Sequence, residues 1–126
     1  MSNTCCRDRR ITAAIELAAV HREFDSARYV HQDIPVLLVQ GDPDRGYHNS
    51  VSAYSQLAPP KWFITLRGSA HSPPFELPRG PEASLVDTTT SAFWDYALRG
   101  DAAASGALTT AVVTAGHRAS LELQSR

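Results

Sequence analysis

The chain has 126 residues, of which 43% are hydrophobic and 20% are charged, and its formal net charge is −1. This length fits one ordinary domain or a piece of a larger one, and the composition is typical of a globular chain rather than a disordered one. No stretch concentrates lysine and arginine enough to hold a phosphate backbone, so we expect no nucleic-acid partner.

The two cysteines, Cys5 and Cys6, are neighbours, and adjacent cysteines rarely form a disulfide with each other. Cys-x-x-Cys spacing is absent and no two of the five histidines lie within four residues of one another, so we expect no metal site. A basic stretch before the apolar run at 11–20 resembles a signal peptide. Glu16 interrupts that run, which is also too short to cross a membrane. We therefore expect a cytoplasmic protein without a membrane span.

Three segments predict the strands of a sheet. Residues 11–20 contain alanines, which favour a helix, but their alternating apolar pattern favours a strand, and we predict a strand. Residues 35–40 form a continuous apolar run that stops at Gly41, and residues 61–66 form an aromatic and β-branched run that stops before Gly68. Continuous apolar runs are typical of strands buried on both faces of a parallel sheet. We therefore predict about three parallel strands.

Three further segments predict helices that pack on this sheet. The first has Asn49 or Ser50 as its N-cap and ends before the prolines at 59–60. The second begins with Ser-Leu-Val-Asp, which resembles a capping box with Asp in place of the usual Glu, and occupies residues 84–99, and the third occupies residues 101–116. A strand, a helix and a strand in this order form a βαβ unit, so the fold class that we predict is α/β.

Polar residues follow two of the predicted strands. Asp42 and Asp44 come just after the strand at 35–40, and His71 comes after the strand at 61–66. Taken alone, such residues are most often polar turns or solvated histidines. Parallel neighbouring strands, however, bring them to one edge of the sheet, where a carboxylate can hold one ring nitrogen and leave the other to accept a proton. We predict that Asp44 lies within hydrogen-bond reach of His71, with Asp42 as the competing acid.

The order of these motifs resembles the C-terminal third of the α/β-hydrolases. Residues 35–44 look like the strand and acid turn of esterase-like members, and residues 68–75 look like the histidine loop. Residues 90–101 look like the final helix, and residues 6–15 look like the entry to the strand after the nucleophile. The resemblance covers nearly the whole chain. It implies a mostly parallel sheet flanked by helices, with residues 1–126 as a single partial α/β-hydrolase domain.

The triad of this family runs Ser, then Asp or Glu, then His along the chain. The resemblance therefore implies Asp44 as the acid and His71 as the general base of a serine hydrolase that acts on small-molecule carboxylic esters without a cofactor. The family acid usually sits third after the glycine, which favours Asp44 over Asp42. The sequence departs from the family at residues 45–48, where a hydrophobic-Pro segment often follows the acid.

The nucleophile of such a triad is absent from this sequence. A nucleophile elbow has the form Gly-x-Ser-x-Gly, and none of the seven glycines has Ser or Cys two positions later. We therefore expect this chain alone to be inactive. The alternative is a non-catalytic α/β module that binds a partner chain or a small ligand. A partial sheet would also expose an unpaired strand near Ile11, through which we expect self-association.

Overall fold

The computed structural model describes residues 8–19, 32–76 and 80–126. These residues contain a sheet of four strands in the order β1-β2-β3-β4. The strands are β1 (Ala14–Leu17), β2 (Val36–Gly41), β3 (Lys61–Leu66) and β4 (Ala119–Gln124). The first three run parallel, as predicted, whereas β4 runs antiparallel beside β3 and was not predicted. The sheet is therefore mixed but mostly parallel, and the chain has an α/β fold.

The strand β1 is shorter than the run at 11–20 from which it was predicted. It pairs with β2 over four residues, from Ala14 beside Val36 to Leu17 beside Val39. Ala18 follows with a positive φ of 49°, a backbone conformation that does not continue a strand. Residue 20, the end of the predicted run, lies outside the described residues.

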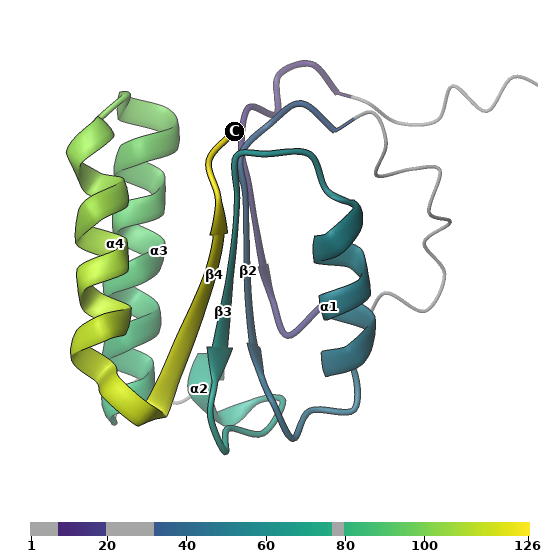
Figure 1. Cartoon of the computed structure of the whole chain (residues 1–126), viewed down its shortest axis with the longest axis vertical. Coiled ribbons are helices and arrows are strands. Elements are labelled where there is room, and N and C mark those ends of the chain that lie inside the picture. Colours follow the sequence, from purple (N-terminus) through teal and green to yellow (C-terminus); the bar gives the residue numbers. More distant parts are fainter. Residues whose placement is uncertain (1–7, 20–31, 77–79) are drawn as a thin grey trace, which may run out of the picture.

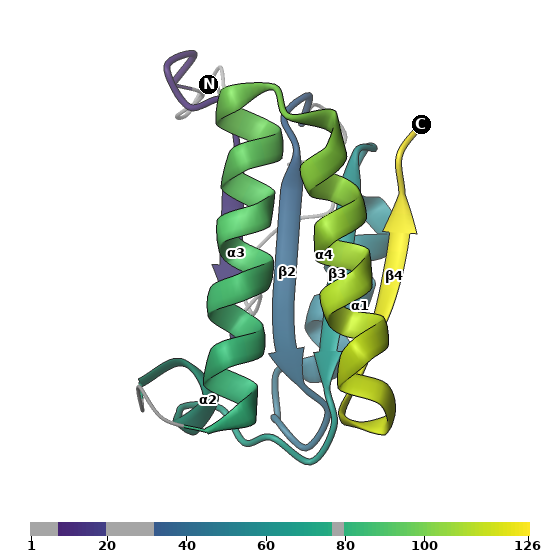
Figure 2. The ribbon, with the colours of Figure 1, turned by 90° about the vertical axis from the view of Figure 1, so that its left-hand side faces the viewer.

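Helices cover both faces of the sheet (Figure 1). The helix α1 (Tyr47–Gln56) lies on one face, and α3 (Pro81–Arg99) and α4 (Ala102–Ala115) lie side by side on the other (Figures 1 and 2). The short helix α2 (Pro73–Glu76) lies near the start of α3, and the 3₁₀ turn η2 (Gly116–Arg118) joins α4 to β4. The three longer helices were predicted, whereas α2 lies in what reads as a proline-rich loop.

Two of the predicted helix starts are wrong. The helix α1 begins at Tyr47 after Gly46, earlier than the predicted caps Asn49 and Ser50, because the chain enters the helix directly from the turn that follows β2. The helix α3 begins at Pro81, whose fixed φ suits a first helical position, and not at the capping box. The helix α4 begins after Asp101, whose side chain accepts a hydrogen bond from the Ala103 amide, as predicted.

Each face of the sheet has its own apolar core. The alternating side chains of β2 and β3 point to opposite faces, as they must in an extended strand. Trp62 contacts Phe93 edge-to-face under α3, and Phe63 contacts Tyr54 under α1. Burying each large apolar side chain stabilises the fold by roughly 1.5–3 kcal/mol. The buried residues that β2 and β3 contribute to the α3–α4 face are Leu37, Val39, Trp62, Ile64 and Leu66, and those that they contribute to the α1 face are Val36, Leu38 and Phe63.

Candidate functional site

The turn after β2 holds the candidate acid. The loops that follow β2 and β3 leave the sheet at the same end, the lower end in Figure 2. Within the first loop, the backbone amide of Asp44 donates to the carbonyl of Gly41 at 3.2 Å. The Asp44 carboxylate accepts a hydrogen bond from the Gly46 amide at 2.7 Å, directly before α1 begins. The carboxylate is therefore fixed at a helix N-terminus, where the unpaired amides and the helix dipole favour negative charge.

A second aspartate, Asp42, connects the loop after β3 to this turn by a hydrogen bond. The Asp42 carboxylate accepts a hydrogen bond from the Gly68 amide at 2.7 Å and lies 3.6 Å from the Arg67 guanidinium. Gly68 has a φ of 71°, which a residue with a side chain adopts only with strain. Asp42 therefore shapes the loop that presents His71, and in the described part of the chain the hydrogen bond to the ring comes from Asp44 and not from Asp42.

Asp44 and His71 lie in direct contact. The Nδ1 atom of His71 is 2.7 Å from the Oδ2 atom of Asp44, so the predicted contact is present and Asp44, not Asp42, makes it. The Asp44 side chain is only 4% exposed, whereas the His71 side chain is 55% exposed. A buried carboxylate thus holds one nitrogen of a ring whose other side faces solvent.

The surroundings of Asp44 favour its ionised form. Burial by itself raises the pKa of the carboxyl group, because it removes water from the charge. The Gly46 amide, the His71 ring and the Gln40 side chain act in the opposite direction, and together they lower the pKa below its ordinary value of 3.8. Asp44 is therefore a carboxylate near neutral pH, able to fix the ring orientation and to stabilise a protonated ring.

Two buried polar side chains close to Asp44 were not predicted to belong to the site, although Ser50 was predicted as a possible N-cap. Gln40 and Ser50 are each 1% exposed, and the Ser50 hydroxyl donates to the Gln40 Oε1 atom. The Gln40 amide nitrogen makes no hydrogen bond of normal geometry, yet this side chain helps to lower the pKa of Asp44. The signal was present, since Gln40 is the one polar residue in the apolar run at 35–40.

The strand end and the histidine loop approach so closely that Gly41 has no room for a side chain. A Cβ atom added to Gly41 would lie 1.7 Å from the backbone oxygen of Ser69. Glycine at this position therefore allows the two loops to meet, and with them Asp44 and His71.

This arrangement can move a proton but lacks the remaining parts of an acyl-transfer site. With Nδ1 held by Asp44, the Nε2 atom of His71 is the nitrogen available to a substrate or nucleophile. In the part of the chain that the structure describes, no hydroxyl group is hydrogen-bonded to the ring. The described residues also hold no cluster of three or more His, Cys, Asp or Glu side chains suited to a metal ion. Cys5 and Cys6 lie outside them.

Comparisons with known proteins add no family to this description. No protein-family model matches the chain, and no curated protein is significantly similar to it. Within residues 8–19, 32–76 and 80–126, no helix is both long enough and apolar enough to cross a membrane.

Proposed function

We propose that this chain supplies the acid and the general base of an α/β-hydrolase-type serine hydrolase. In this proposal Asp44 is the acid, His71 is the base, and the substrates are small-molecule carboxylic esters in the cytoplasm. The contact of 2.7 Å between the buried Asp44 carboxylate and the exposed His71 ring is the observation that carries the proposal. It has the geometry that a triad needs between its acid and its base.

The chemistry proceeds through the free nitrogen of the ring. The Nε2 atom of His71 accepts the proton of a serine hydroxyl as the serine oxygen attacks the ester carbonyl carbon. Asp44 stabilises the imidazolium that forms, and the ring then gives the proton to the departing alkoxide. Because the sequence contains no Gly-x-Ser-x-Gly elbow, the serine and the oxyanion donors come from polypeptide outside residues 1–126.

The alternative is a non-catalytic α/β module that binds a partner chain or a small ligand. The missing elbow favours this alternative for the chain taken alone. An apolar groove beside β1 also offers such a module a binding surface. The two functions differ in one respect that can be measured, because only the hydrolase requires His71.

The decisive experiment joins this chain to the polypeptide encoded upstream in the same reading frame. The joined protein should react with a fluorophosphonate probe and hydrolyse p-nitrophenyl acetate, whereas residues 1–126 alone should be no faster than free imidazole. His71→Gln and Asp44→Asn should each remove most of the activity. His117→Gln, which changes an exposed histidine in η2, is the matched control and should leave it intact. An upstream sequence without an elbow, or activity that survives His71→Gln, would refute the proposal.

A further inference from the structure

The outer side of β1 is an open sheet edge in the described part of the chain. The strand β1 stands at the end of the sheet order, with β2 as its neighbour. The amides of Ala14 and Ala18 donate towards β2, to the carbonyls of Pro35 and Val39. Because successive residues of a strand direct their amides to opposite sides, the N–H and C=O groups of Ile15 face outwards. Ala13 and Leu17 extend this outward-facing row.

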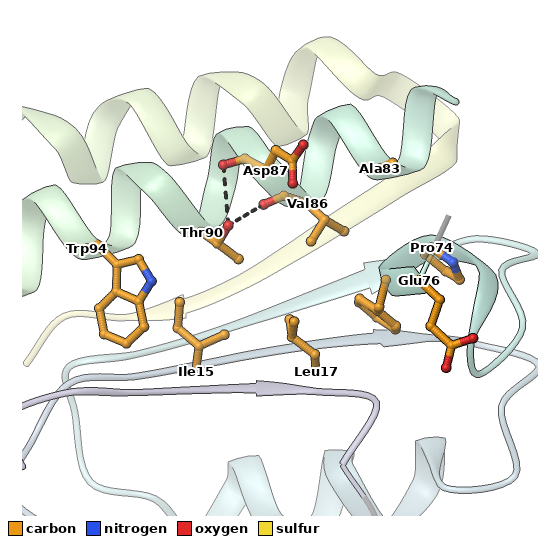
Figure 3. A pocket seen from close by; sticks show the side chains of 10 residues that line it. Ile15, Leu17, Pro74, Glu76, Ala83, Val86, Asp87, Thr90 and Trp94 are labelled. Carbon is orange, nitrogen blue, oxygen red and sulfur yellow. Dashed lines mark hydrogen bonds between the residues drawn. The ribbon is translucent and has the colours of Figure 1, made fainter. Parts of the chain in front are cut away.

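A groove of about 500 Å³ runs beside this edge, between β1, α2 and α3. Figure 3 shows Ile15 and Leu17 pointing from β1 towards Trp94 and Val86 of α3. Leu17 is 43% exposed and Trp94 is 37% exposed, so two large apolar side chains of the groove remain partly in water. Exposed apolar surface beside an open strand is typical of a binding site for another strand.

The surface beside β1 is acidic near the C-terminal end of the strand and basic near its N-terminal end. Asp87 and Glu76 line the groove, and Glu76 lies beyond the C-terminal end of β1 (Figure 3), whereas no lysine or arginine lines it. The exposed Arg9 precedes the N-terminal end of β1. Its neighbour Arg10 is already paired with Asp8 at 2.6 Å. A strand that runs antiparallel to β1 with the same sequence would therefore carry its own Arg9 to the acidic end.

We infer that residues 1–126, when no upstream polypeptide is joined to them, use the β1 edge and its groove to bind a second copy of this chain. The two β1 strands pair antiparallel about a two-fold axis at Ile15, which extends the sheet across both copies. In this register Leu17 of each copy lies opposite Ala13 of the other copy. It enters the other copy's groove near the Trp94 side chain there. If the two-fold axis lay at Glu16 instead of Ile15, the two Glu16 carboxylates would lie opposite each other. Like charges in that position destabilise a strand pair.

The matched pair Leu17→Asp and Val113→Asp tests this surface by sedimentation velocity over a range of protein concentrations. Wild type should form a dimer, and Leu17→Asp should raise its Kd about thirtyfold or more, since a charge would enter the centre of the interface. Val113→Asp changes a residue of α4 that is 74% exposed and should leave the Kd unchanged. A wild-type monomer at every concentration, an open-ended series of larger species, or equal effects of the two substitutions would each overturn the inference.

Swapping the charges of residues 9 and 76 tests the orientation of the two copies. Arg9→Glu should weaken the dimer about threefold, as should Glu76→Arg, because each leaves like charges facing across the rim. The double variant should recover the wild-type Kd. Amide exchange gives the register, since the Ile15 amide should be protected in wild type and unprotected in Leu17→Asp. Additive effects in the double variant, or an Ile15 amide that exchanges at the same rate in both proteins, would contradict antiparallel pairing at β1.

Discussion

Replacing Gly41 with alanine should separate Asp44 from His71 without changing either side chain. The added Cβ atom would lie 1.7 Å from the Ser69 backbone oxygen, whereas real Cβ atoms essentially never come within 3.0 Å of another heavy atom. The two backbone segments must therefore move apart by about 1.3 Å. Overpacking of this kind costs about 1–3 kcal/mol of unfolding free energy. A movement of that size in the histidine loop would take the 2.7 Å contact beyond hydrogen-bond distance.

Two measurements follow this change, urea unfolding for the stability and proton NMR for the hydrogen on the Nδ1 atom of His71. Gly106→Ala in α4 is the matched control, because an added Cβ meets no atom within 4 Å there. Alanine at that helical position should raise the unfolding free energy by up to about 1 kcal/mol. If Gly41→Ala keeps both the stability and the NMR signal of wild type, the close approach of strand and loop is not what places the pair.

Three further substitutions test the surroundings of the site and of the helices. Asp44→Asn should lower the unfolding free energy at neutral pH. Because the folded protein lowers the pKa of Asp44, this difference should persist above the ordinary value of 3.8 and shrink as the pH falls below it, which urea titrations at several pH values would show. Gln40→Leu should raise the pKa of Asp44, since it removes one of the groups that lower it, and carbon NMR of the carboxyl group measures this shift. An unchanged pKa would exclude a role for the amide. Asp101→Ala should cost about 1 kcal/mol by removing the N-cap of α4, whereas Asp101→Asn should cost much less.

The buried strands were predictable because their sequences allow few other structures. β2 and β3 are short, largely apolar runs that are buried along their whole length. The strand β4 alternates apolar and polar residues over residues 119–124, a pattern that indicates a strand with one solvent-exposed face. It was overlooked because it follows a predicted helix end at Gly116. The helix α2 gives almost no signal, since a single turn needs no apolar period.

The contact between Asp44 and His71 was predictable from topology alone, since parallel neighbouring strands deliver both residues to one edge. The groups that tune the contact were not, because they act through the three-dimensional packing of distant segments. Gln40 and Ser50 belong to a strand and a helix that meet only in the fold. The proximity of Gly41 to Ser69 likewise depends on how two loops cross.

The antiparallel strand β4 has a consequence for the order in which the protein folds. Residues 67–118 separate β4 from its partner β3, and closing so long a segment is entropically costly and slow. The α3–α4 hairpin consists of sequence neighbours, so it can form early and carry β4 back to the sheet. Gly100, with a φ of 70°, and the capping Asp101 make the joint of this hairpin. We therefore expect that joint, at the opposite end of α4 from β4 (Figure 1), to influence how soon the edge of β3 is closed.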